Sequence, residues 1–100
     1  MNGIFIDTSA WYAFIDRNDP DHKEADRLYK SNKKPLITSN FIFDESVTLL
    51  MSRLGFDIAV KFGESLKKSS LVNIIQITDE VEEDYRDLLS VHFRDFLIKL

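Results

Sequence analysis

The sequence predicts an α/β fold, in which a short parallel sheet of about three strands lies in a three-layer α/β/α arrangement with helices on both faces. Two apolar runs, Ile4–Ile6 and Leu71–Ile77, have the composition of buried strands. Segments with helical spacing of apolar residues separate such runs. This alternation of strands and helices is typical of parallel sheets.

The first half of the chain is expected to hold two strands joined by two helices. After the Ile4–Ile6 strand, Thr8 or Ser9 is expected to cap a helix. Pro20 predicts the start of a second helix, and Pro35 lies beyond its end. These signals give helices over Ser9–Asp16 and about Asp21–Ser31, and a second strand over Leu36–Thr38.

The second half begins with a long helix. Ser39 and Asn40 are both good caps, and Gly55 ends the helix. Its core face is expected to carry Phe43, Val47, Leu50 and Leu54. The remaining elements are a helix over about Asp57–Ser69, the Leu71–Ile77 strand, and a helix that starts near Thr78 or Asp79.

Composition limits the class of protein. One hundred residues with 44% hydrophobic side chains suggest a single domain with a real core. The absence of cysteine excludes disulfides and thiolate metal sites. No segment has the pattern of a signal peptide or the length of a membrane helix, so a cytoplasmic protein without membrane contact is expected. The net charge of -4 argues against nucleic-acid binding through a broad basic surface, but it does not exclude a nuclease.

Asp7 follows the first apolar run directly and precedes two hydroxyl residues. One interpretation is a helix cap, a position that Asp favours. The other is a functional carboxylate, since active sites in open parallel sheets lie at the carboxyl ends of the strands. Because Thr8 and Ser9 offer alternative caps, the sequence favours the functional interpretation.

A second acid, Glu45, falls in the first turn of the helix after the second strand. If the first two strands are neighbours, its carboxylate can approach that of Asp7. Two close carboxylates in a partly dry site need a cation, and Mg²⁺ or Mn²⁺ prefers oxygen ligands. Helical periodicity does not decide whether Glu45 or its neighbour Asp44 points inward.

Such an ion would acidify a water that attacks a phosphodiester and would stabilise the charge that develops. Thr8, Ser9 and Asn40 are the polar residues expected to orient water or carboxylates around it.

Two motifs occur in order: IFIDTSAWYAFID at residues 4–16, and ITSNFIFDESVTLL at residues 37–50. They combine a strand-borne acid followed by Thr and Ser with a helix that carries Asp-Glu. Together they closely resemble the opening of a PIN domain. The resemblance covers about residues 2–84 of a single domain at 1–100, and residues 85–100 form a divergent helical tail.

The resemblance implies a Mg²⁺- or Mn²⁺-dependent endoribonuclease whose first two metal-binding acids are Asp7 and Glu45. Its substrate would be RNA. Such domains are often the toxin of a toxin–antitoxin pair, held inactive by a small antitoxin protein. The third and fourth acids of the family have no clear counterpart, since Asp95 follows the third strand too soon and lacks a hydroxyl neighbour. The fold is therefore expected to be truncated at the C-terminus, and the apolar tail favours a homodimer.

Two other hypotheses stay open. The chain could be a catalytically inactive, truncated PIN fold that serves as an interaction or dimerisation module. It could also transfer phosphoryl groups through an aspartyl nucleophile, as haloacid-dehalogenase-type phosphatases do. Those enzymes want a second Asp two residues after the first, and Ser9 stands there instead.

Overall fold

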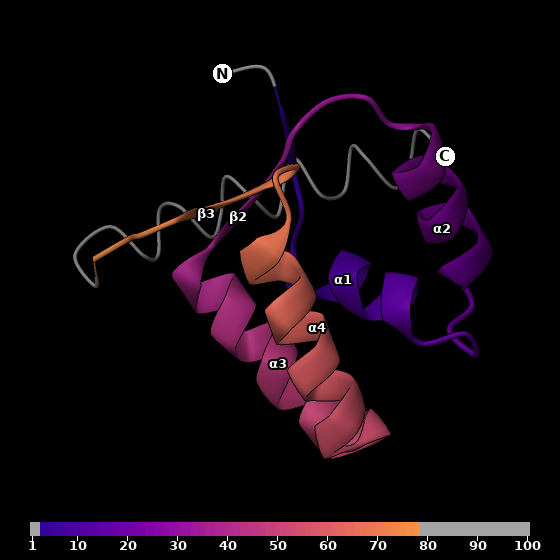
Figure 1. Ribbon diagram of the computed structural model, residues 1–100. Helices are drawn as coiled ribbons and strands as arrows, with labels where there is room; N and C mark the ends of the chain where they lie inside the picture. The colour runs from indigo at the N-terminus through magenta and orange to yellow at the C-terminus, as the bar shows by residue number, and fades with distance from the viewer. Residues whose placement is uncertain (1–2, 79–100) are drawn as a thin grey trace.

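The computed structural model describes residues 3–78, which form a parallel three-stranded sheet and four helices (Figure 1). The strands are β1 (Ile4–Phe5), β2 (Leu36–Ser39) and β3 (Val72–Ile75), in the order β1-β2-β3. The predicted α/β class and short parallel sheet are confirmed. The predicted helix from Thr78 or Asp79, Asp95 and the tail 85–100 lie outside the described residues.

The register of the sheet aligns the ends of β1 and β2. Ile4 pairs with Leu36 in the parallel ladder, which continues past β1 through the Ile6 N–H and the Ile37 carbonyl at 2.9 Å. Gly3 permits this close approach, because a Cβ there would lie 2.5 Å from Ile37 Cδ1. The chain therefore leaves both strands at the same edge of the sheet.

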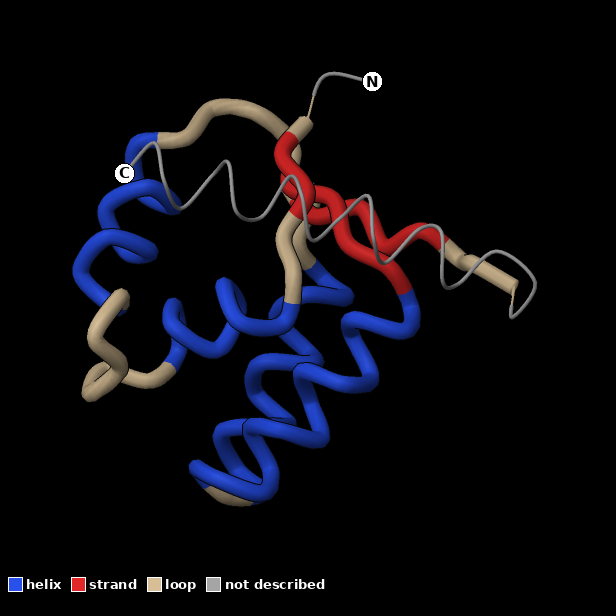
Figure 2. The backbone as a smooth tube through the Cα atoms, turned by 180° about the vertical axis from the view of Figure 1, so that it is seen from behind, coloured by secondary structure: helices blue, strands red, loops and turns tan. Residues whose placement is uncertain are grey.

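The helices are α1 (Thr8–Ile15), α2 (His22–Ser31), α3 (Asn40–Leu54) and α4 (Phe56–Lys68). Seen from two opposite sides, α1, α3 and α4 lie together on one side of the strands, and α2 flanks α1 (Figures 1 and 2). Of the two predicted caps, Ser39 is the one that caps α3, and Gly55 with a φ of 100° ends the helix as predicted. No helix within residues 3–78 has the length and apolar character that crossing a membrane requires.

The start of α1 differs from the prediction. The helix begins at Thr8, and its cap is Asp7 rather than Thr8 or Ser9. The backbone of Asp7 is extended, with φ −92° and ψ 171°, and its carboxylate accepts the Thr8 N–H at 2.7 Å. The assignment of the cap to a hydroxyl residue is wrong, because Thr8 is already helical and its hydroxyl binds elsewhere.

The core lies between the sheet and the helices α1, α3 and α4. Leu50 of α3 is fully buried there, and the Trp11 ring of α1 meets Phe62 of α4 edge-on at 5.8 Å between ring centroids. On α3 the most buried residues include Ile42 and Ser46, whereas Phe43, Val47 and Leu54 are half-buried. The buried face of α3 is thus turned slightly from the predicted one.

Replacing Leu50 with Ala is expected to lower the free energy of unfolding by about 2–5 kcal/mol, because it opens a cavity in this core. Met51→Ala is the matched control, since Met51 follows directly and is 45% exposed; its effect should stay near 0.5 kcal/mol. Chemical denaturation followed by circular dichroism measures both. Equal losses would contradict the assignment of Leu50 to the core.

Candidate functional site

Polar residues gather where β1 and β2 end. Asp7 caps α1 shortly after β1, and Ser39 at the end of β2 caps α3 by accepting the Ile42 N–H at 3.1 Å. Because the two strands are parallel neighbours, the N-termini of α1 and α3 lie at the same edge of the sheet. This is the edge at which open parallel sheets carry their ligand sites.

Thr8 connects the two predicted carboxylates. Its backbone N–H donates to Asp7 Oδ1 at 2.7 Å, and its hydroxyl donates to Glu45 Oε1 at 2.5 Å. Thr8 is 7% exposed, Asp7 is half-buried and Glu45 is exposed, so this link runs from the buried start of α1 to the surface. Asp7 and Glu45 thus both accept hydrogen bonds from Thr8, one from its backbone N–H and the other from its hydroxyl. The carboxylate that accepts from the hydroxyl belongs to Glu45, not to Asp44.

The other two predicted polar residues have different surroundings. Ser9 is exposed on α1. The Asn40 side chain binds the backbone of Ile77, with Oδ1 accepting the N–H at 2.8 Å and Nδ2 donating to the carbonyl at 3.3 Å. Asn40 therefore fastens the chain that follows β3 to the start of α3.

Thr38 supports the site and was missed by the sequence analysis. It is 1% exposed, donates its hydroxyl to the Ile6 carbonyl at 3.2 Å, and lies 3.4 Å from the Trp11 indole nitrogen that donates to it. It joins the residue before Asp7 to the buried face of α1. A hydroxyl residue within an apolar strand was the available signal.

An open hollow of about 530 Å³ runs along α3 beside Glu45. Its walls combine carboxylate, hydroxyl and apolar side chains of this helix: Phe41, Asp44, Glu45, Thr48, Leu49 and Ser52. Of the predicted site residues, Glu45 lines this hollow. A ligand bound to Glu45 would therefore be open to solvent and to a large substrate.

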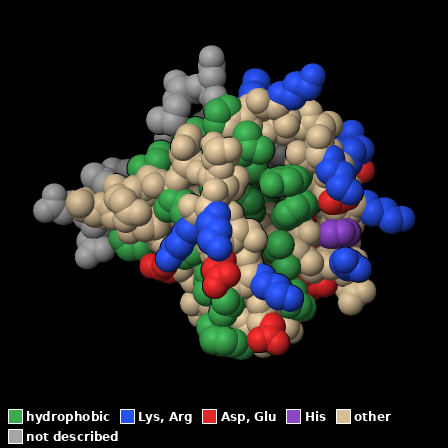
Figure 3. Space-filling view, viewed as in Figure 1, with side chains coloured by type: hydrophobic (Ala, Val, Ile, Leu, Met, Phe, Trp, Pro, Cys, Tyr) green, Lys and Arg blue, Asp and Glu red, His purple; other side chains and the backbone are tan. Residues whose placement is uncertain are grey.

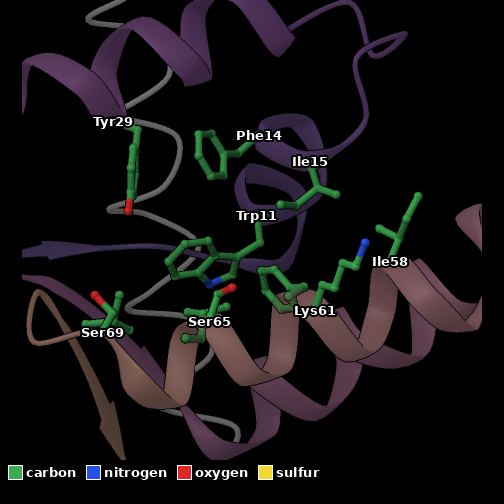
Figure 4. A pocket seen from close by; sticks show the side chains of 11 residues that line it. Trp11, Phe14, Ile15, Tyr29, Ile58, Lys61, Ser65 and Ser69 are labelled. Atoms are coloured by element: carbon green, nitrogen blue, oxygen red, sulfur yellow. The ribbon is translucent and has the colours of Figure 1, made fainter.

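A second pocket, of about 360 Å³, lies between α1, α2 and α4 and has a different character (Figure 4). Trp11, Phe14 and Tyr29 line one side of it, and Lys61 of α4 lies on the other. Figure 3 shows hydrophobic side chains gathered over this region, with Lys and Arg side chains around them. None of the predicted site residues lines this pocket. The candidate site formed by the two carboxylates is therefore at the edge of the sheet and separate from this pocket.

The four predicted site residues with carboxylate or hydroxyl groups offer only oxygen atoms to a metal ion. Asp7 and Glu45 supply carboxylates, and Thr8 and Ser9 supply hydroxyls. Within residues 3–78, no cluster of three or more His, Asp or Glu side chains is placed to hold a metal ion. Two carboxylates and hydroxyls suit a hard divalent cation that keeps several of its waters.

A second contact joins α1 to α3, away from the carboxylate edge. The Arg53 guanidinium lies over the Tyr12 ring, 5.1 Å from its centroid, and the Tyr12 hydroxyl donates to Asp16 at 2.6 Å. This hydrogen bond, with that from the Asn18 N–H, lowers the pKa of Asp16, and it raises the pKa of Tyr12. The far end of α1 is therefore anchored independently of Thr8.

Comparison with known proteins gives a consistent result. The chain matches the PIN domain over residues 4–98. It is 35% identical to the 23S rRNA-specific endonuclease VapC20 of Mycobacterium tuberculosis strains CDC 1551 / Oshkosh and H37Rv, over 89% of this chain and 67% of theirs. A crystal structure of M. tuberculosis VapC20, a toxin that cleaves the sarcin-ricin loop, superposes with a TM-score of 0.72 at 33% identity, over 94% of this chain and 76% of that one.

Asn40→Ala is expected to release the segment after β3, because it removes both hydrogen bonds to Ile77. The free energy that protects the Ile77 amide from hydrogen exchange should fall by about 1–3 kcal/mol. Amide exchange measured by NMR reports this directly. Asn73→Ala, at an exposed position of β3, is the control. Unchanged protection of Ile77 in Asn40→Ala would contradict the role of this side chain.

Tyr12→Phe is expected to weaken the acid dependence of stability. The native pKa of Asp16 is lowered below its ordinary value of 3.8, so Asp16 stabilises the fold above that pH and the contribution is lost as the pH falls through the native pKa. Without the Tyr12 hydroxyl the native pKa of Asp16 should rise towards 3.8, so less stability is lost on acidification. The free energy of unfolding, measured between pH 5 and pH 2, gives the slope of stability against pH, and Tyr29→Phe is the control. Identical slopes in Tyr12→Phe and wild type would contradict the role of the hydrogen bond.

Proposed function

The chain belongs to the PIN domain family, and from this premise we propose that it is a divalent-metal-dependent endoribonuclease that hydrolyses RNA phosphodiester bonds. We further propose that it acts as the toxin of a toxin–antitoxin pair. The two VapC20 proteins that it resembles are named as rRNA endonucleases, and the related crystal structure is that of an RNA-cleaving toxin.

The observation that carries the proposal is the hydrogen-bonded arrangement around Thr8. Asp7 follows the end of β1, and both its carboxylate and that of Glu45 bind Thr8. Glu45 lies in the second turn of α3 and not, as the sequence predicted, in the first, because the helix begins at Asn40. A capping role explains Asp7 alone, but it does not explain why a second acid, 38 residues later in the chain, meets the same threonine. A shared ligand for both acids accounts for the pair.

Asp7 and Glu45 are the residues that would hold Mg²⁺ or Mn²⁺, because their oxygens match the preference of these ions. The bound cation would supply an acidified water and positive charge for the phosphorane-like transition state. Ser9 is exposed next to Thr8, and its proposed role is to orient water or a phosphate oxygen. The amide of Asn40 holds Ile77, so its influence on the site would pass through the chain after β3.

Further acids from other parts of the molecule would complete the site, since nucleases of this kind use more than two carboxylates. Asp95 and the tail lie outside the described residues. We propose an RNA substrate, a small antitoxin protein and a second copy of this chain as partners, in the cytoplasm. These proposals follow from the family and from the apolar sequence of the tail.

An alternative is an inactive PIN fold that serves as an interaction module. The sequence feature behind it is that the third and fourth acids of the family have no clear counterpart in this chain. It predicts a folded chain without metal-dependent cleavage, so the two functions are separated by one assay.

The assay incubates the full chain with a labelled RNA hairpin of the sarcin-ricin type, with Mg²⁺, with Mn²⁺ or with EDTA. Cleavage is expected with either metal and not with EDTA. Asp7→Asn and Glu45→Gln should each reduce the rate by about 100-fold or more, because each removes a charge that holds the cation.

Asp44→Asn is the matched control, since it removes a carboxylate from the neighbouring exposed position of α3. Its rate should stay close to that of the wild type. Cleavage that survives Asp7→Asn, or that depends on Asp44 rather than Glu45, would contradict the assignment. A folded chain that cleaves no RNA would support the interaction module.

A further inference from the structure

The hydroxyl of Thr8 has a specific task at the candidate site. We propose that Thr8 is a positioning residue that fixes the Glu45 carboxylate towards Asp7, and that it thereby sets the affinity of the site for a divalent cation. This inference rests on the proposed function. The inference goes beyond that function because it assigns the control of metal affinity to a residue that carries no charge.

The geometry of the contact supports a strong orienting bond. The Thr8 hydroxyl and Glu45 Oε1 are 2.5 Å apart, within the roughly 2.5–2.7 Å expected for a hydroxyl that donates to a carboxylate. Thr8 is 7% exposed, so water has little access to its hydroxyl, whereas Glu45 lies on an exposed part of α3. A hydroxyl has a single proton to donate, and here that proton is committed to Glu45.

Glu45 has reason to need such a contact. It lies on an exposed part of α3 and has three side-chain torsions, so binding a cation would require these torsions to become ordered. A bond from Thr8 restricts them before the cation arrives. Thr8 is well suited to this, since its β-branched side chain is stiff and it is held in α1, which Asp7 caps.

Three other polar residues at the edge have different surroundings. Ser9 is exposed, and the Asn40 amide is engaged by Ile77. Ser39 uses its hydroxyl to cap α3. Thr8 is therefore a neutral side chain through which the position of Glu45 can be controlled.

A purely structural role for Thr8 must be separated from this one, because its hydroxyl also joins α1 to α3. Arg53 provides the matched control. It joins the same two helices through the Tyr12 ring, 5.1 Å away, and it lies eight residues beyond Glu45 on α3, about 12 Å along the helix axis. Loss of the Arg53 contact loosens the helix pair and leaves Glu45 bound to Thr8.

The experiment uses the full chain and three variants: Thr8→Val, which keeps the shape and removes the hydroxyl, Thr8→Ser, which restores it, and Arg53→Met. Binding of Mn²⁺ is measured directly from the electron paramagnetic resonance signal of the free ion, and unfolding is measured in parallel. Thr8→Val should weaken Mn²⁺ binding by about 10-fold or more, as loss of an orienting partner does at metal sites.

Thr8→Ser should recover binding to within about 3-fold of the wild type, and Arg53→Met should lower stability without changing the affinity. Wild-type affinity in Thr8→Val, or an equal loss in Arg53→Met, would overturn the inference. If Thr8→Val does not fold, Thr8→Ala replaces it with the same expected loss and the same refutation.

The failure of this inference can be told apart from failure of the proposed function. If Asp7→Asn abolishes Mn²⁺ binding and RNA cleavage while Thr8→Val leaves both intact, the nuclease stands and the role of Thr8 is refuted. If the wild type binds no Mn²⁺ and cleaves no RNA, both are refuted.

Discussion

The parallel pairing of β1 with β2 is the constraint on which the polar chemistry of this chain depends. It sends Asp7 and the start of α3 out of the sheet at one edge, although they are separated by more than thirty residues in the sequence. Glu45 can then reach Thr8 from the adjacent helix. An antiparallel strand in place of β2 would carry α3 away from Asp7, and Glu45 could then no longer reach Thr8.

Buried hydroxyls hold that edge together. Thr38 ties the end of β1 to Trp11 of α1, Ser39 caps α3, and Thr8 joins the carboxylates of Asp7 and Glu45. Burying a hydroxyl costs free energy unless it is hydrogen-bonded, so each of these bonds favours one arrangement of strand end and helix start. The acids are thus carried by a rigid frame, while the hollow beside Glu45 stays open.

Much of this could be predicted from the sequence, because apolar runs and helical spacing report burial. The three strands, the Ser39 cap and the Gly55 stop follow from such local signals. What the sequence could not give were bonds between a side chain and distant atoms. Helical spacing left Glu45 and Asp44 undecided, and the resemblance to the PIN family favoured Glu45; its bond to Thr8 appears only in the structure. The engagement of Asn40 depends on Ile77, 37 residues away. The cap of α1 was misassigned because three adjacent residues, Asp7, Thr8 and Ser9, all have capping side chains.

The central claim is that Asp7 and Glu45 share one cation at the edge of the sheet. Anomalous diffraction from a crystal of the full chain soaked in Mn²⁺ tests it most directly. We expect a single strong peak with one oxygen of each carboxylate about 2.1 Å away. A peak bound by only one of the two, or two carboxylates that point apart with no metal between them in fully soaked crystals, would contradict it.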